Sequence, residues 1–243
     1  MIEAGGVALR GDLALPRPAR GVVLFAHGSG SSRLSPRNRH VAGVLQDAGL
    51  ATLLMDLLTA REEEIDARTG HLGPRDRGAP VPPSRGMAGI AQEEERPNSL
   101  RAFRYDVGLL AERLIGAIDW LGRETETRDL PLGCFGASTG AGAALVAAAA
   151  RAERVGAVVS RGGRPDLAGD ALPRVRAPTL LIVGGDDRPV IAMNEDARSR
   201  MTAPTRLEIM PGATHLFEEP GALETVASLA ARWFDRHLAR PRG

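Results

Sequence analysis

The sequence predicts one α/β domain built on a mostly parallel central sheet with helices on both faces. Its 243 residues are enough for one large domain. Short apolar runs alternate along them with longer segments of helical period. All but the first of these runs are almost continuously apolar, which is typical of strands covered on both faces. Hydrophobic residues make up 43% and charged residues 25% of the chain, as in ordinary globular proteins.

Seven short runs are expected to form strands because they are apolar or rich in β-branched residues. In chain order they are Val7–Leu15, Val22–Ala26, Ala51–Met55, Leu132–Phe135, Ala157–Val159, Thr179–Val183 and Arg206–Ile209. We find no internal repeat that would divide the chain, so we expect residues 1–243 to form a single domain.

Four longer segments have the apolar spacing of helices. Ser35-Pro36 supplies a cap and a first-turn proline for the first helix, whose apolar stripe covers Val41–Ala48. Val107–Leu121 carries a second stripe, and Leu223–Phe234 forms an amphipathic C-terminal helix. Thr139–Ala150 is rich in Ala on every side, which suits a helix buried against the sheet.

The net charge argues against several classes of function. Thirty-one basic residues, all of them Arg, face 30 acidic ones, so the formal charge is +1. We therefore expect no nucleic-acid partner, because such proteins gather a basic excess on one face. The absence of Lys excludes Schiff-base chemistry and a P-loop.

The N-terminus and the apolar runs also indicate where in the cell the protein is expected. No basic segment followed by an apolar run opens the chain, and Ala141–Ala150 is half as long as a membrane span. A single cysteine, Cys134, precludes an intramolecular disulfide. We expect a cytoplasmic protein with no membrane partner, as a monomer or a small homo-oligomer.

The strongest chemical signal is the motif Gly136-Ala137-Ser138-Thr139-Gly140, which matches G-x-S-x-G. An expected strand leads into the motif and an expected helix follows it. That arrangement is a sharp turn that lifts a Ser hydroxyl above the sheet, and small residues are needed on both sides of it. Although the pattern also arises by chance in glycine-rich chains, its context predicts that Ser138 is a nucleophile.

A nucleophilic Ser needs a base, and the base needs an orienting acid. His215 lies after the last expected strand and before the last helix, at the sheet edge where Ser138 emerges. Asp186 and Asp187 both follow the strand Thr179–Val183, between Ser138 and His215 in the chain. Asp187 directly precedes Arg188-Pro189, a helix start, and we predict that it is the orienting acid. Asp186 is expected to cap the helix or to be exposed.

Two backbone amides are expected to bind the developing oxyanion. One is that of Thr139, which follows the nucleophile. The other is that of Ser29, in the small-residue loop His27-Gly28-Ser29-Gly30-Ser31-Ser32 after the strand Val22–Ala26. We expect His27 to bond the backbone of this loop. The loop could instead hold phosphate, but it has the spacing of neither phosphate-binding motif.

The ordered set His27-Gly28, Ser138, Asp187 and His215 resembles the α/β-hydrolase superfamily. Three longer segments resemble its dienelactone-hydrolase-like bacterial members, and the likeness covers nearly the whole chain. They are Phe25–Arg33, Ser160-Arg161-Gly162-Gly163 and Pro211–Phe217. The resemblance implies an α/β-hydrolase fold with little or no cap domain. True dienelactone hydrolases use a Cys nucleophile, so Ser138 favours ordinary esters over dienelactone.

From Arg61 to about Arg101 the chain has no sustained period and many Pro and Gly residues. Similar proteins pass almost directly from a segment like His71-Leu72 to one like Tyr105-Asp106-Val107, so we infer an irregular insertion at about residues 73–104. It is expected to be mobile. It could cover Ser138 as a lid or be a solvated excursion, and the sequence does not favour one over the other.

We expect a serine hydrolase that cleaves carboxylic esters, of short acyl chain, through an acyl-enzyme on Ser138 and without metal or cofactor. Its partner would be a small-molecule ester. The same residues could support acyl transfer, thioester or amide hydrolysis, or cofactor-free perhydrolysis. A second alternative is that the chain is a non-catalytic accessory module. Arg161 could bind a substrate carboxylate, but a structural salt bridge is the favoured role among so many charges.

Overall fold

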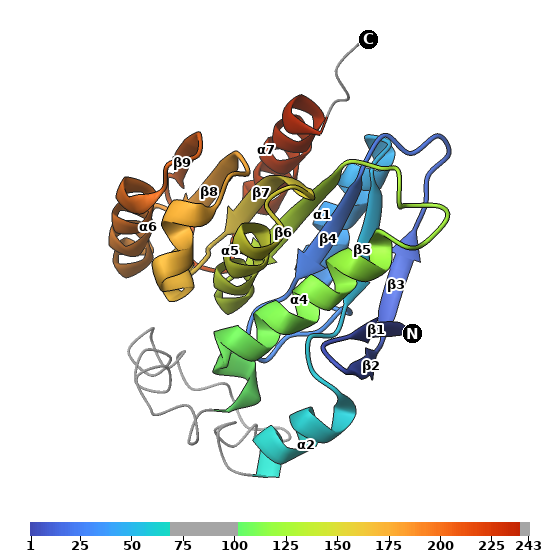
Figure 1. The fold of residues 1–243 in the computed structure, drawn as a ribbon. Helices are drawn as coiled ribbons and strands as arrows, with labels where there is room; N and C mark the ends of the chain where they lie inside the picture. The colour runs from blue at the N-terminus through green and yellow to red at the C-terminus, as the bar shows by residue number, and fades with distance from the viewer. Residues whose placement is uncertain (69–101, 239–243) are drawn as a thin grey trace.

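The computed structural model describes residues 1–68 and 102–238. A seven-stranded sheet forms its centre, in the order β3-β5-β4-β6-β7-β8-β9 (Figure 1). All neighbouring strands are parallel except β3, which pairs antiparallel with β5. The expected mostly parallel α/β sheet is confirmed. The strands are β3 (Gly11–Ala14), β4 (Val22–Ala26), β5 (Ala51–Met55), β6 (Leu132–Ala137), β7 (Val155–Arg161), β8 (Thr179–Gly184) and β9 (Thr205–Met210).

The expected first strand, Val7–Leu15, is wrong as a single element. It is divided into β2 (Val7–Leu9) and β3, which belong to different sheets. β2 pairs antiparallel with β1 (Ile2–Ala4), while β3 joins β5 at the edge of the main sheet. Gly5 and Gly6 both have positive φ and form the tight turn between β1 and β2. The residues on both sides of Arg10 are extended, so the sequence pattern did not reveal that the pairing partner changes there.

Helices cover both faces of the sheet (Figure 1). On one face, α1 (Pro36–Asp47) and α7 (Ala222–His237) pack on Phe25 and Phe135, whose ring centroids are 4.9 Å apart. The other face carries α4 (Val107–Leu121), α5 (Thr139–Ala150), the 3₁₀ segment η3 (Pro165–Arg174) and α6 (Arg188–Arg200). Both faces of the central strands are therefore buried, which accounts for their unbroken apolar sequences.

The start predicted for the first helix is confirmed, and a side chain caps it. Ser35 precedes α1, and its hydroxyl accepts a hydrogen bond from the Asn38 amide at 3.3 Å. Asp106 caps α4 in the same way through the Leu109 amide at 3.0 Å. Such caps satisfy amides that the first helical turn leaves without partners.

The segment from Arg61 is not irregular throughout, because α2 spans Ala60–Arg68. Thr59 and Glu62 begin it with reciprocal bonds, each side chain accepting from the other's amide at 3.2 and 2.7 Å. The buried Asp66 carboxylate accepts from the amides of Phe103 and Arg104, joining α2 to η2 (Phe103–Tyr105). The inferred insertion at 73–104 and its proposed role as a lid lie outside the described residues, apart from residues 102–104.

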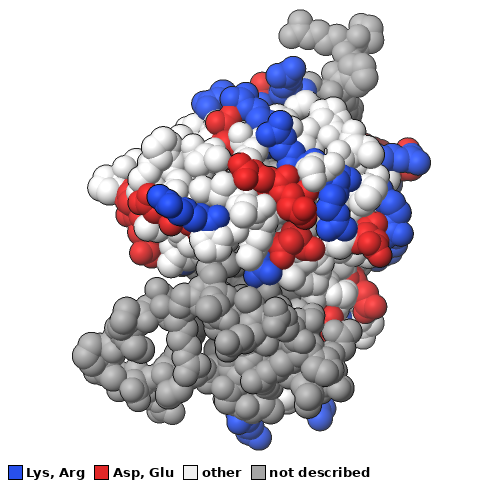
Figure 2. Space-filling model, turned by 90° about the vertical axis from the view of Figure 1, so that its left-hand side faces the viewer, with Lys and Arg blue, Asp and Glu red and all other residues white. Residues whose placement is uncertain are grey.

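Charges of both signs are distributed over the surface. Figure 2 shows one face, on which acidic and basic side chains are interspersed in small groups. This mixture is what near-equal numbers of acidic and basic residues lead one to expect. In the described part of the chain, no helix has the length and apolarity required to cross a bilayer.

Candidate active site

Ser138 occupies a sharp turn between β6 and α5, with φ 50° and ψ −128°. Such a positive φ is uncommon for a residue with a side chain and requires support from its surroundings. A Cβ on Gly136 would lie 2.4 Å from Ala141 Cα, and one on Gly140 would lie 2.4 Å from the His27 carbonyl oxygen. The two glycines are therefore required by close packing, as the motif predicted.

Backbone hydrogen bonds hold this turn on both sides. The Ser138 amide donates to the Arg161 carbonyl in β7 at 3.3 Å. The Ser138 carbonyl accepts from the amides of Ala141 and Arg164 at 3.0 and 3.1 Å. The turn is thus tied to its own helix and to the segment that leads into η3.

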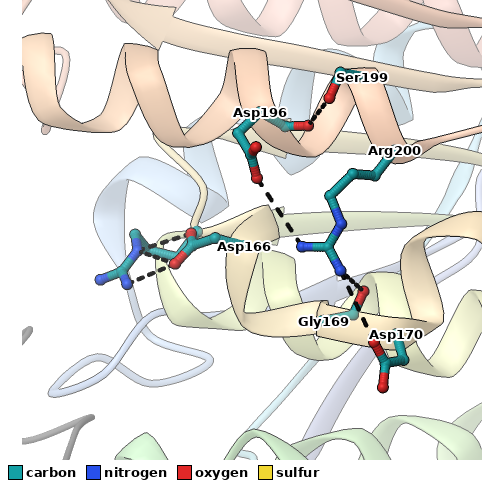
Figure 3. A network of polar contacts seen from close by, with 7 residues as sticks. Asp166, Gly169, Asp170, Asp196, Ser199 and Arg200 are labelled. Carbon is teal, nitrogen blue, oxygen red and sulfur yellow. Dashed lines mark hydrogen bonds and ion pairs between the residues drawn. The ribbon is translucent and has the colours of Figure 1, made fainter.

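Polar side-chain contacts support the segment that leads from Arg164 into η3 (Figure 3). The Arg164 guanidinium binds the Asp166 carboxylate through Nε at 2.9 Å and Nη2 at 2.7 Å. Arg200 reaches from α6 to the Gly169 carbonyl at 3.0 Å and lies 4.0 Å from the carboxylates of Asp170 and Asp196 (Figure 3). The Arg200 contacts connect η3 to α6, while the Arg164 contact supports the start of η3, whose leading amide bonds the Ser138 carbonyl.

His215 and Asp187 are in direct contact, with Nδ1 and Oδ2 2.7 Å apart. Asp187 stands at the N-cap position of α6, but its side chain makes no capping bond. Its carboxylate is 7% exposed, whereas the His215 ring is 25% exposed. Asp186 is exposed. A buried carboxylate at Nδ1 favours the tautomer with a proton there, which leaves Nε2 free to accept one.

Close contacts also shape the loop that carries His215. The Thr214 hydroxyl and amide both donate to one Glu219 carboxylate oxygen, at 2.6 and 3.0 Å. The Thr214 hydroxyl contributes most to lowering the pKa of Glu219. Below the loop, Gly162 has φ 50°, and a Cβ there would lie 2.9 Å from the His215 carbonyl oxygen. The position of His215 thus depends on the glycine that directly follows β7 as well as on its own loop.

The two predicted oxyanion donors are adjacent, but one of them has an internal partner. The Ser29 amide donates to the Thr139 hydroxyl at 3.0 Å. Thr139 is fully buried as the first residue of α5. A Cβ on Gly28 would lie 3.0 Å from Ser138 Cβ, so the loop runs close beside the Ser138 side chain. For the Ser29 amide to bind an oxyanion, it must share or leave the Thr139 hydroxyl.

His27 anchors the same loop from below. Its Nε2 accepts from the Leu57 amide, and its Nδ1 donates to the Gly28 carbonyl, both at 3.0 Å. This pair of bonds determines its tautomer. Burial lowers the pKa of His27, despite opposing effects of the Gly28 carbonyl and Asp56. The expected backbone role of His27 fits these contacts.

A cavity of about 160 Å³ brings Ser138 and His215 together beside the loop that carries Ser29. Arg37, Asn38 and Arg161 also line it. The first two stand in the first turn of α1, directly after the loop, a position that could have drawn attention to them in the sequence. A second cavity, of about 430 Å³, shares Gly28, Ser29, Ser31 and Ser35 with the first but is lined by neither Ser138 nor His215.

The salt bridge favoured for Arg161 is wrong for the part of the chain that the structure describes. Arg161 is 7% exposed and forms no ion pair with a described residue. Its Nε and Nη1 atoms have no hydrogen-bond partner there. The guanidinium carbon lies 5.8 Å from the centre of the Phe217 ring. Arg161 therefore presents a charged group to the cavity without a described counter-ion.

The Cys134 thiol and possible metal ligands are two further features of the described residues. Cys134 is buried in β6, where burial raises the pKa of its thiol to about 12. Within residues 1–68 and 102–238, no group of three His, Cys, Asp or Glu side chains is arranged to hold a metal ion.

Known proteins are similar to this chain in sequence and in fold. A sequence profile of the dienelactone hydrolase family matches residues 9–239. The crystal structure of a dienelactone hydrolase from Anabaena variabilis is 58% identical, covers 98% of this chain and 95% of its own, and superposes with a TM-score of 0.83. Est1E from Butyrivibrio proteoclasticus has the same fold at 14% identity, with a TM-score of 0.71 over 98% of both chains.

Two sequences from Mycobacterium tuberculosis strains are 50% identical over 240 residues. Both carry the provisional name phosphoribosyl transferase. The match covers 99% of this chain but 46% of each relative. The chain thus spans about half the length of these curated relatives.

Proposed function

Because the chain belongs to the dienelactone hydrolase family, within the α/β hydrolases, we propose that it hydrolyses carboxylic esters through an acyl-enzyme on Ser138. The observation that carries this proposal is the contact of 2.7 Å between His215 and the buried Asp187, in a site whose cavity is also lined by Ser138. A nucleophile, a base and an orienting acid are the three groups that serine acyl transfer requires.

The proposed reaction has two steps. The Ser138 oxygen attacks the ester carbonyl carbon while His215 Nε2 takes the hydroxyl proton. The tetrahedral intermediate then collapses, and His215 gives the proton to the departing alcohol. Water attacks the acyl-enzyme with His215 again as base, which releases the acid and restores Ser138. Asp187 stabilises the imidazolium that forms in both steps.

The amides of Thr139 and Ser29 are the proposed oxyanion donors. The Ser29 amide lies in the loop after β4, which passes beside Ser138, and the Thr139 amide begins α5, where the helix dipole favours negative charge. The cavity of about 160 Å³ is small beside pockets for drug-sized ligands, which are about 300–1,000 Å³, and this suits a short acyl or alcohol group. We therefore place short-chain esters first among substrates.

The name of the mycobacterial relatives gives no second candidate for this site. It applies to the whole of each relative, of which this chain matches less than half. Thioesters, amides, acyl transfer to alcohols and perhydrolysis would use the same three side chains, and a non-catalytic module would use none. These alternatives become outcomes of one experiment.

The experiment is a kinetic panel on the purified full chain. p-Nitrophenyl esters of increasing acyl length are compared with one thioester and one anilide, with added alcohol in a parallel series. We expect the highest kcat/KM with short esters, acid as the product, and a loss of about 10⁴-fold or more in kcat for Ser138→Ala. Equal turnover by Ser138→Ala, or no turnover of any acyl compound, would overturn the proposal.

A further inference from the structure

The loop that carries Ser29 is held by the segment of chain that directly follows β5. Asp56 and Leu57 form this segment, and β5 lies beside β4, from which the loop starts. The Leu57 amide donates to His27 Nε2 at 3.0 Å, where the loop begins. The Asp56 carboxylate binds Arg33, where the loop ends. Two adjacent residues of one strand end therefore hold both ends of the loop.

The contact between Asp56 and Arg33 involves the main chain and the side chain of the arginine. Oδ1 of Asp56 accepts from the Arg33 amide at 2.8 Å, and Oδ2 accepts from Nη1 of the guanidinium at 2.7 Å. The two side chains are only 12% and 19% exposed. Because both bonds are charge-assisted and shielded from water, they restrict the end of the loop more than a surface ion pair would. The Asp12 carboxylate lies 3.5 Å from Nε of Arg33 but is half exposed, so it adds little.

The loop needs such anchors because glycines flank Ser29 on both sides. Gly30 has φ 72°, and glycine loses more conformational freedom on folding than any other residue. Asp56 can serve as an anchor because its own main chain is fixed, its amide donating to the Arg10 carbonyl at 2.9 Å. The direction of the Ser29 amide therefore depends on a contact made further along the chain, at the end of the loop.

We propose that Asp56 is a positioning residue for the Ser29 amide, because its bonds to Arg33 hold the loop where this amide can reach an oxyanion formed at Ser138. This inference rests on the proposed ester hydrolysis. Asp56 acts through the main chain of the loop and exchanges no proton with the substrate. The Thr139 hydroxyl holds the same amide from the side of α5, at 3.0 Å. The donor is thus positioned from two directions, by β5 and by α5.

The kinetic test compares two substitutions of Asp56 on p-nitrophenyl acetate. Asp56→Ala removes both acceptors, whereas Asp56→Asn keeps one oxygen for the Arg33 amide. We expect kcat to fall roughly 10- to 100-fold in Asp56→Ala and less in Asp56→Asn, with little change in KM, because a displaced donor weakens binding of the transition state alone. Each rate is divided by the concentration of sites that a fluorophosphonate labels, so that unfolded protein does not count. Unchanged kcat per site in Asp56→Ala would overturn the proposal.

Asp66 offers a matched control, because its carboxylate binds an arginine in the same manner away from the Ser29 loop. Oδ2 of Asp66 accepts from the Arg104 amide at 3.1 Å and from Nε of the same arginine at 3.2 Å. Asp66→Ala should lower the urea midpoint of unfolding but leave kcat per site nearly unchanged. Equal losses of kcat in Asp66→Ala and Asp56→Ala would overturn the proposal, because kcat would then follow stability and not the position of the loop.

A double variant tests whether Asp56 acts on the same amide as Thr139. Once Thr139→Val has displaced the Ser29 amide, Asp56→Ala has less left to disturb, so the combined loss of kcat should be smaller than the product of the two single losses. Asp66→Ala combined with Thr139→Val should show the product. A full product for the Asp56 pair would mean that Asp56 and Thr139 act independently, and would overturn the proposal.

Hydrogen exchange separates this inference from the proposed reaction, because it needs no substrate. By mass spectrometry, the peptide that covers residues 28–35 should exchange faster in Asp56→Ala than in the wild-type protein and at the wild-type rate in Asp66→Ala. Faster exchange in a protein that hydrolyses no ester would count against the proposed function and leave the anchoring of the loop by Asp56 standing. Unchanged exchange in Asp56→Ala would overturn the inference even if ester hydrolysis is established.

Discussion

The Ser29 amide donates its hydrogen bond to the Thr139 hydroxyl, 3.0 Å away, so two proposed oxyanion donors are linked before any substrate binds. The bond joins the glycine-rich loop after β4 to the first residue of α5. Glycines on both sides of Ser29 leave the loop backbone otherwise free to turn. We therefore interpret the Thr139 hydroxyl as the group that positions the Ser29 amide.

Thr139→Val tests this interpretation because it keeps the shape of the side chain and removes the acceptor. We expect kcat on a short ester to fall about 10-fold with little change in KM, since loss of a whole donor costs about 10²–10³-fold and misplacement should cost less. Thr139→Ser should restore most of the rate. An unchanged or higher kcat for Thr139→Val would show that the bond competes with the oxyanion.

The two adjacent carboxylates should differ sharply. Asp187→Asn removes the buried acceptor at His215 Nδ1 and should lower kcat by about 10³–10⁴-fold. Asp186 is exposed, so Asp186→Asn, the matched control, should cost less than about 10-fold. Steady-state kinetics on one ester compares them. The opposite order would assign the orienting role to Asp186.

Cys134 should resist thiol reagents in the folded protein. It is buried in β6, and its raised pKa, about 12, leaves almost no thiolate at pH 8. Labelling with iodoacetamide, followed by mass spectrometry, should be slow in buffer and rapid in denaturant. Rapid labelling without denaturant would show that β6 opens or that the thiol is accessible.

His27 should make the fold less stable in mild acid. Burial lowers its pKa from 6.5, so the unfolded chain binds a proton near that pH before the folded chain does. This contribution to stability is present above pH 6.5 and is lost as the pH falls. If His27 stays neutral in the folded state, the loss between pH 7.5 and 5.5 is about 1.4 kcal/mol.

Urea unfolding at the two pH values measures this loss. His27→Gln should be less stable at pH 7.5, because its flexible amide does not reproduce the fixed ring geometry of the two backbone bonds, but should lose less stability on acidification. His237, whose pKa is lowered by burial and by Arg236, is expected to account for part of the remaining dependence. The same pH dependence in His27→Gln as in the wild-type protein would contradict the assignment.

Much of the central sheet could be predicted because its strands are buried on both faces. Val22–Ala26 and Ala51–Met55 are observed with the predicted ends. The motif around Ser138 was informative for a related reason, because a Cβ on Gly136 or Gly140 would lie 2.4 Å from a backbone atom and only Gly fits there. Local backbone geometry of this kind restricts which residue type can occupy a position, so it can be inferred from the sequence.

Features that depend on partners distant in sequence were harder to predict. The break at Arg10 depends on which strand each half pairs with. Helix α2 has little apolar surface, and its only clear signal was the Thr59–Glu62 pair. The state of Arg161 could not be predicted either, because whether a cation has a counter-ion depends on packing among β7, α1 and the His215 loop.

The central claim is that Ser138 is the nucleophile, and covalent labelling tests it most directly. The full chain is treated with a fluorophosphonate and mapped by peptide mass spectrometry, beside Ser138→Ala as control. We predict a single adduct, on Ser138, that is absent from the variant, because the probe reacts with a Ser activated by its base. An adduct on any other residue, or labelling that persists in Ser138→Ala, would contradict the account.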